Sequence, residues 1–292
     1  MTIAPAQDLT ADPAESTTPP QPDLEPDLEA IKARQQATWS TGDYHVIATQ
    51  IQIVAELLIE RLDVRSTERV LDVATGSGNA AIAAARRGCE VVGIDYVPAL
   101  LERARRRSKA EGLSIDFVEG DAEALTFLDG SFDVVTSVFG AMFAPDQDRT
   151  AAELLRVTRS GGRIGVVAHT PDGFIGQLFR TIARHVPPPA GLRSPIQWGT
   201  EVRLRELFGA ETSDIRTEKR TYAFRGRSAE AWVETWRREY GPIRKAFDAV
   251  SGVGGRVALE QDIVELIGRF NRAADGTMVV PSEYLEAVIV KR

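Results

Sequence analysis

The residues best suited to chemistry in this chain are three acids, Asp72, Asp95 and Asp121, each at or near the end of an apolar run. Carboxylates accept hydrogen bonds from hydroxyl and amino groups and attract positive charge. If the apolar runs are neighbouring parallel strands, their carboxyl ends meet at one edge of a sheet, where ligands bind. The spacing therefore predicts one site for a polar, partly charged ligand.

A glycine-rich turn follows the first acid. Residues 70–79 (Val-Leu-Asp-Val-Ala-Thr-Gly-Ser-Gly-Asn) read as a strand, a turn and a helix start, and a run of small residues continues to Ala85. Glycine allows the backbone to approach a ligand closely, and the N–H groups that open a helix favour polar groups. The segment from Gly76 to Ala81 fits G-x-G-x-x-G/A, a dinucleotide pattern that is weak by itself.

Three positions favour S-adenosylmethionine (SAM) over NAD as the ligand. Asp72 stands four residues before Gly76, where its carboxylate can hold the turn and face an ammonium group. Asp95 is placed to accept hydrogen bonds from both ribose hydroxyls, and Asp121, beside apolar Ala122, suits an adenine amino group. Each acid also has a structural interpretation, as a cap of a turn, a helix or a loop. Their occurrence together at successive strand ends favours the ligand.

Strands and helices alternate around these acids. Strands are expected at residues 70–73, 91–95, 115–119, 132–139, 163–168, 217–224 and 277–290. Helices are expected at residues 27–38, 46–61, 98–110, 172–185, 200–208, 228–240 and 256–273, with a flexible glycine segment at 251–255. The rhythm predicts an α/β, doubly wound parallel sheet with its ligand at the carboxyl ends of the strands.

As an ordered set, these motifs resemble those of the class I SAM-dependent methyltransferases, especially the small-molecule group that includes the ubiquinone and menaquinone biosynthesis C-methyltransferases. The resemblance rests on residues 70–79, 92–96, 119–122, 131–139 and 161–168, and covers roughly residues 68–170. It implies a Rossmann-like methyltransferase fold of seven strands, mostly parallel, with the last strand antiparallel. One departure is Ala74, which replaces the first glycine of D-x-G-x-G-x-G and leaves slightly less room for the cofactor.

The resemblance and the motifs together give the expected site. The residues expected to contact SAM are Asp72, Ala74, Thr75, Gly76, Asn79, Asp95, Tyr96, Asp121, Ala122 and Ser137. For Ser137, a bond to the local backbone is the alternative. His169, just beyond the fifth strand, is the best-placed histidine for a general base if the acceptor is protonated, and a structural role is its alternative. Candidate acceptor walls, or core residues, are Met142, Phe143, Phe174 and Trp198.

The flanking segments divide the chain into three parts. Residues 1–27 are acidic and proline-rich and are expected to be a disordered tail. Residues 28–67 are expected to form N-terminal helices and a lid, although residues 39–45 equally fit a packed connection. Residues 68–292 are expected to form the SAM-binding domain, with helical insertions over the acceptor at about 170–210 and 228–273.

Composition narrows the partners. The net charge of −7 argues against nucleic acid and anionic lipid. The absence of a signal-peptide pattern, the short apolar runs and the single Cys89 favour a cytoplasmic protein without a membrane span. No metal-ligand spacing is evident, and the sequence does not indicate the oligomeric state. The prediction is methyl transfer to a small molecule, with an NAD-dependent oxidoreductase or a SAM-binding protein without methyl transfer as alternatives.

Overall fold

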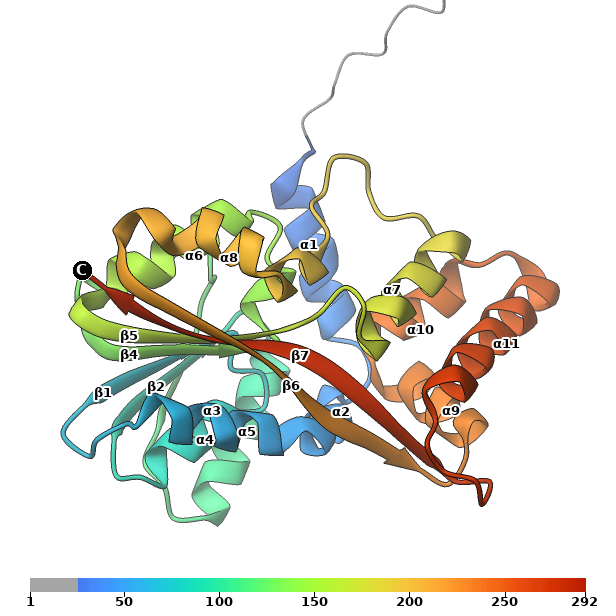
Figure 1. Cartoon of the computed structure of the whole chain (residues 1–292), viewed down its shortest axis with the longest axis horizontal. Coiled ribbons are helices and arrows are strands. Elements are labelled where there is room, and N and C mark those ends of the chain that lie inside the picture. The colour runs from blue at the N-terminus through green and yellow to red at the C-terminus, as the bar shows by residue number, and fades with distance from the viewer. Residues whose placement is uncertain (1–25) are drawn as a thin grey trace, which may run out of the picture.

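The computed structural model describes residues 26–292. These residues fold around one seven-stranded sheet of strand order β3-β2-β1-β4-β5-β7-β6 (Figure 1). β7 is antiparallel to both of its neighbours, while the pairs among β1 to β5 are parallel. The predicted fold class is therefore confirmed, including the antiparallel last strand. The strands are β1 (Arg69–Val73), β2 (Glu90–Asp95), β3 (Asp116–Glu119), β4 (Phe132–Val138), β5 (Thr158–His169), β6 (Thr212–Gly226) and β7 (Met278–Lys291).

The strand order places the site. The chain steps outward from β1 to β2 and β3, and then returns to pair β4 on the other side of β1. In open α/β sheets, the crevice outside such a reversal is the usual ligand site. Asp72 on β1 is in register with Gly93 on β2 and Thr136 on β4, so the first acid stands at the centre of the reversal.

Helices cover both faces of the sheet (Figure 1). α3 (Gln52–Leu62), α4 (Asn79–Ala85) and α5 (Pro98–Ala110) lie on one face, and α6 (Gln147–Val157) and α8 (Glu201–Phe208) on the other. The apolar side of α3 is buried, since Val54, Leu58 and Leu62 are at most 1% exposed. Crossovers of this kind bury a parallel sheet on both faces.

The prediction of a single helix at residues 46–61 is wrong. The chain forms α2 (Tyr44–Ala48), a 3₁₀ turn (Thr49–Ile51) and then α3. At the break, the Asn79 side-chain amide donates a hydrogen bond of 2.9 Å to the Ala48 carbonyl. A side chain that donates a hydrogen bond to a helix carbonyl competes with the backbone N–H that would otherwise bond to it, and so interrupts the helix.

The C-terminal helices form a group at one end of the sheet (Figure 1). This group contains α7 (Phe174–His185), α9 (Ala229–Glu239), α10 (Gly241–Ala249) and α11 (Gly252–Phe270). The expected insertion at 170–210 is thus divided, because α8 packs against α6 on a face of the sheet. The prediction of a flexible segment at residues 251–255 is also wrong. The segment is the first turn of α11, where burial of Leu259, Ile263 and Leu266 offsets the low helix propensity of glycine.

At the N-terminus, α1 (Leu28–Trp39) begins after Asp27, whose side chain accepts a hydrogen bond from Ala30 N at 2.9 Å. Such a cap fixes the start of a helix. Apart from Pro26 and Asp27, the tail expected at residues 1–27 lies outside the described residues. Within residues 26–292, no helix has the length and apolar character needed to cross a membrane.

Candidate functional site

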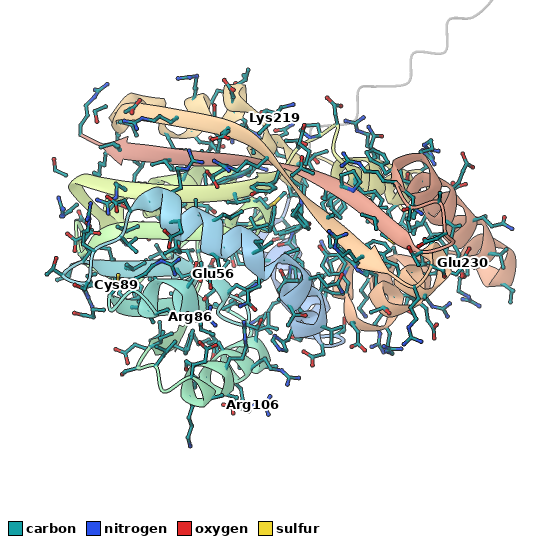
Figure 2. All side chains as sticks on the ribbon, turned by 60° about the horizontal axis from the view of Figure 1, so that its bottom comes forward. Glu56, Arg86, Cys89, Arg106, Lys219 and Glu230 are labelled. Carbon is teal, nitrogen blue, oxygen red and sulfur yellow. The ribbon has the colours of Figure 1, made fainter. Side chains whose placement is uncertain are left out.

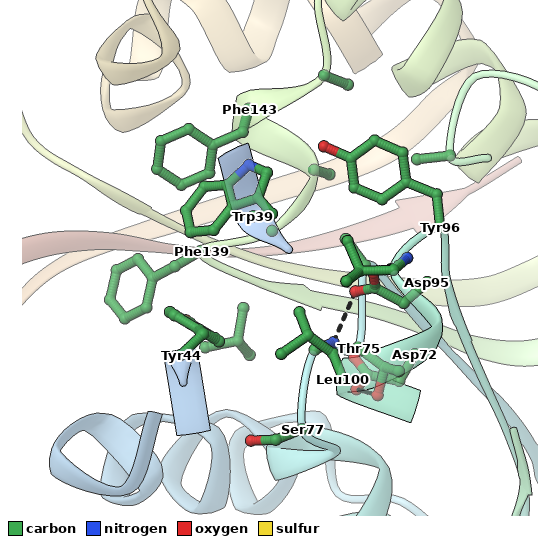
Figure 3. Close-up of a pocket in the computed structure, with 18 of the residues that line it drawn as sticks. Trp39, Tyr44, Asp72, Thr75, Ser77, Asp95, Tyr96, Leu100, Phe139 and Phe143 are labelled. Atoms are coloured by element: carbon green, nitrogen blue, oxygen red, sulfur yellow. Dashed lines mark hydrogen bonds between the residues drawn. The ribbon is translucent and has the colours of Figure 1, made fainter. Parts of the chain in front are cut away.

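A cavity lies at the carboxyl ends of β1, β2 and β4 (Figure 3). Its walls come from the glycine turn, from the segments that follow β2, β3 and β4, and from α1 and α2. The structure brings nine of the ten expected cofactor residues to this cavity. They are Asp72, Ala74, Thr75, Gly76, Asn79, Asp95, Tyr96, Asp121 and Ala122.

Asp72 holds the glycine turn in place. Its Oδ2 accepts hydrogen bonds from Thr75 Oγ1 at 2.6 Å and from Ala81 N at 3.1 Å, and its Oδ1 accepts one from Thr136 Oγ1 at 2.9 Å. Burial raises the pKa of Asp72 to about 6, although these hydrogen bonds act in the opposite direction. The side chain therefore ties the end of β1 to both α4 and β4.

The glycine turn is tight, with several residues in the left-handed backbone conformation and close packing around them. Gly76 and Gly78 have φ of +55° and +87°, which glycine adopts without strain. Ala74 also has a left-handed backbone, with φ of +53°, although it carries a side chain. Gly140 makes room for that side chain, since a Cβ added to Gly140 would stand 2.6 Å from the Ala74 Cβ.

Asp95 closes β2 with its carboxylate against the turn. Oδ2 accepts a hydrogen bond from Gly76 N at 2.8 Å, and Oδ1 accepts one from Val97 N at 2.9 Å. Burial raises the pKa of this carboxyl to about 6. Each carboxylate oxygen accepts about two hydrogen bonds, so each retains one lone pair for a ligand hydroxyl. The bond to Val97 holds the residue that precedes α5, but α5 has no side-chain cap, so the helix-cap interpretation of Asp95 is not supported.

Asp121 takes part in an ion-pair cluster with a residue from α1. Lys32 Nζ lies 2.8 Å from Asp121 Oδ2 and 2.6 Å from Glu123 Oε2, and Glu123 is 3% exposed. One turn later on α1, Gln36 Nε2 donates a hydrogen bond of 2.5 Å to the Tyr96 carbonyl. Lys32, Gln36 and Glu123 were not among the predicted site residues. The i,i+4 spacing of the two α1 side chains, which puts them on one face, was the available signal.

The opposite end of the cavity is aromatic (Figure 3). Trp39 stands edge-on to Tyr44 at 5.6 Å and to Phe143 at 5.1 Å between ring centroids. Phe139, which was not among the predicted site residues, lines the same end. Of the four candidate acceptor walls, Phe143 lines the cavity. The other three, Met142, Phe174 and Trp198, are at most 2% exposed in the core.

Two expected site residues lie outside the cavity lining. Ser137 Oγ donates to the Val73 carbonyl at 2.8 Å and accepts from Ala141 N at 2.9 Å, so its hydroxyl serves the backbone. The His169 ring stacks on the Phe139 ring at 4.0 Å between ring centroids, and Phe139 lines the cavity whereas His169 does not. Burial lowers the pKa of His169 to about 3. The geometry therefore corrects both expectations, because neither side chain faces the ligand space.

Known proteins are similar in sequence to this chain over most of its length. A sequence profile described as a methyltransferase domain matches residues 70–162. An uncharacterized protein of Mycobacterium tuberculosis is 39% identical over 254 residues, which are 86% of this chain and 92% of that protein. The demethylmenaquinone methyltransferase of Thermus thermophilus is 41% identical over 131 residues, 44% of this chain and 60% of that enzyme. The chain belongs to the class I SAM-dependent methyltransferases.

Solved structures agree with the methyltransferase fold. The YcgJ protein of Bacillus subtilis superposes with a TM-score of 0.58 at 22% identity, over 82% of this chain and 97% of that one. A putative methyltransferase of Bacillus halodurans gives 0.55 at 22% identity, over 81% and 98%. The predicted family, enzyme class and cofactor are thus confirmed, and the oxidoreductase alternative is not supported.

Proposed function

We propose that this methyltransferase transfers the SAM methyl group to a small molecule bound at the aromatic end of the cavity. The observation that carries the proposal is the division of one cavity into an end with Asp72, Asp95 and Asp121 and an end with aromatic rings (Figure 3). Hydroxyl and amino groups require hydrogen-bond acceptors, whereas a reactive methyl group requires a dry surrounding. When bound, SAM supplies that methyl group on a positively charged sulfonium.

The polar end fits the adenosine and amino-acid parts of SAM. The free lone pairs of Asp95 accept the two ribose hydroxyls, and the tight turn at Gly76 and Gly78 admits the amino-acid part close to the backbone. Ala122 and Asp121 line the same end, where Ala122 would pack against the adenine ring and Asp121 would accept a hydrogen bond from its amino group. Asp72 acts by holding the turn in shape.

The aromatic end aligns the reaction. The faces of Trp39 and Tyr44 attract a sulfonium cation and exclude water, and alignment accounts for much of the rate of a direct displacement. His169 is not assigned as a base, because its lowered pKa and its position behind Phe139 remove it from the acceptor. An acceptor that is ionised at working pH needs no protein base.

Three observations support a small acceptor. Lys32 and Gln36 tie α1 down beside the cavity, so that α1 acts as a lid and limits the size of the molecule that enters. The net charge of −7 is unfavourable for nucleic acid. The partial relatives named demethylmenaquinone methyltransferases also support a small cyclic acceptor.

The acidic charge and the single, buried Cys89 support a cytoplasmic location.

Calorimetry with SAM, S-adenosylhomocysteine (SAH) and NADH tests the cofactor assignment. We expect saturable binding of SAM and SAH, no binding of NADH, and loss of SAH binding in Asp95→Ala. The matched control is Asp116→Ala, an exposed acid at the start of β3, which should bind SAH like the parent. Equal SAH affinity in Asp95→Ala and the parent would remove the ribose assignment. Transfer of a labelled methyl group in a metabolite screen then tests the small acceptor.

A further inference from the structure

Strand β6 forms one outer edge of the sheet. Within residues 26–292 it pairs with β7 alone, so no strand of the described chain covers its other side. Figure 2 shows β6 as the outermost strand, with Lys219 on it. An edge strand presents a row of backbone N–H and C=O groups that have no partner within the sheet, and another strand can pair with them. β6 is therefore a surface on which a further strand can dock.

One face of β6 carries charges of alternating sign. Every second residue is charged, in the order Asp214, Arg216, Glu218 and Arg220, so these side chains lie on the same face of the strand. Contacts along the strand agree with this arrangement. Arg216 Nε lies 2.6 Å from Asp214 Oδ2, and Arg220 Nη2 lies 2.7 Å from Glu218 Oε2. An alternating order of this kind reverses its signs when it is read backwards, so the segment is complementary to an antiparallel copy of itself.

A second copy of β6 that pairs antiparallel about Thr217 matches all of these charges. Arg216 then stands directly opposite Glu218 of the second copy, and Asp214 stands opposite its Arg220. A two-fold axis forms each of these pairs twice, because residue i contacts residue j and residue j contacts residue i. Opposite charges that face each other across antiparallel strands stabilise the pairing.

Neighbouring registers bring like charges together. Pairing about Arg216, Glu218 or Lys219 places that charged residue directly opposite its own copy. Like charges in this position are destabilising, and charged side chains on edge strands usually prevent pairing between copies for this reason. In β6 the order of the charges removes this penalty when the pairing is centred on Thr217. The charges therefore favour that register over its neighbours.

We propose that two copies of this chain pair through residues 214–220 of β6 and form a dimer with one continuous sheet. The sheet runs from β7 and β6 of one copy into β6 and β7 of the other, and the two-fold axis passes beside Thr217. The inference does not depend on the proposed function, because none of these residues lines the cavity. One short pair of strands buries less surface than the interface of a permanent dimer, so the dimer is weak and reversible.

Sedimentation velocity of the full chain, from low to high micromolar concentration, tests the dimer. We expect the parent to dimerise as its concentration rises, and added salt to weaken the dimer because it screens exposed charges. Glu218→Arg and Arg216→Glu should each weaken dimerisation about tenfold or more, since two favourable pairs become two pairs of like charges. The matched control is Arg225→Glu, an exposed residue of the same strand outside residues 214–220, which should dimerise like the parent.

A mixture of the two weakened variants tests the register. In a mixed dimer, the acids at positions 216 and 218 of one variant face the bases at the same positions of the other. An equimolar mixture of Glu218→Arg and Arg216→Glu should therefore dimerise, although neither variant does so alone over the same range of concentration. A general change in charge or a fault in folding would not be repaired by mixing.

Folding of the variants is checked by thermal unfolding before sedimentation. Glu218 also lies 3.2 Å from Arg61 of α3, but both side chains are exposed, so the loss of this pair should change stability little. A parent that stays monomeric at every concentration would overturn the inference. So would a dimer that persists in Glu218→Arg, which would place the interface elsewhere, or a mixture of the two variants that remains monomeric.

Discussion

The ammonium group of Lys32 lies 2.8 Å from Asp121 Oδ2 and so joins α1 to the loop that follows β3, 89 residues away in the sequence. Glu123 shares the same ammonium group at 2.6 Å. Helix α1 is therefore fastened beside the cavity by charges that come from the cofactor site itself. Lys32 itself lines the cavity, so α1 forms part of the wall of the cofactor site.

Replacing Lys32 with methionine should lower the free energy of unfolding by about 2 kcal/mol. The buried Glu123 then loses its counter-charge, and an unpaired buried charge is strongly unfavourable. Urea denaturation measures the loss. Lys32→Arg should keep most of the stability, and adding Glu123→Gln to Lys32→Met should restore part of it. If the double variant is no more stable than Lys32→Met, the unpaired Glu123 is not the cause.

Ala74→Gly should raise the free energy of unfolding by up to about 1 kcal/mol, because glycine adopts the left-handed backbone without strain. SAH should bind at least as tightly, since the substitution only removes a methyl group beside Gly140. Asp63→Gly is a control for the backbone effect, with a φ of +48° at the end of α3. It should be stabilised without a change in SAH affinity. A less stable Ala74→Gly would show that the alanine side chain has a packing role.

Arg107→Ala should weaken SAH binding about tenfold. Arg107 Nη1 donates to the Ser77 carbonyl at 2.5 Å and to Asn79 Oδ1 at 2.8 Å, so it holds the glycine turn from α5. Hydrogen bonds from a charged donor contribute about 1.5–3 kcal/mol. The control is Arg106→Ala, one residue earlier on the same helix, at the outer edge of the molecule (Figure 2). Equal loss in both variants would point to general charge rather than to the turn.

SAM should bind more tightly as the pH rises from 5 to 7.5. Burial raises the pKa of Asp72 and Asp95 to about 6, so both are partly protonated at pH 6 in the free protein. A bound sulfonium favours their ionised forms and lowers these pKa values, so binding at pH 6 should release protons. Calorimetry in buffers of different ionisation enthalpy measures this release. SAH, which lacks the sulfonium charge but keeps the ammonium group, should release fewer protons. Proton uptake with SAM would contradict the prediction.

The sequence by itself determined the elements that make the cofactor site. Asp72, Asp95 and the glycine turn were predictable because each belongs to a local pattern, an apolar strand followed by a helix start, whose geometry repeats in every parallel α/β sheet. The rhythm of strands and helices predicted the parallel sheet, whereas the seven-strand count and the antiparallel last strand were implied by the family resemblance. Boundaries were less predictable, because a distant contact such as that of Asn79 with Ala48 divided one expected helix.

Only the tertiary structure decided the rest of the site. Lys32 and Glu123 are 91 residues apart in the sequence but form an ion pair, and Tyr222 contacts Phe139 from the other half of the chain. No local sequence pattern predicts either contact. The sequence placed His169 at the mouth of the sheet, but the direction of its ring depends on the Phe139 ring that packs against it. Strand ends follow from periodicity along the chain, whereas side-chain environments follow from packing between segments that periodicity does not relate.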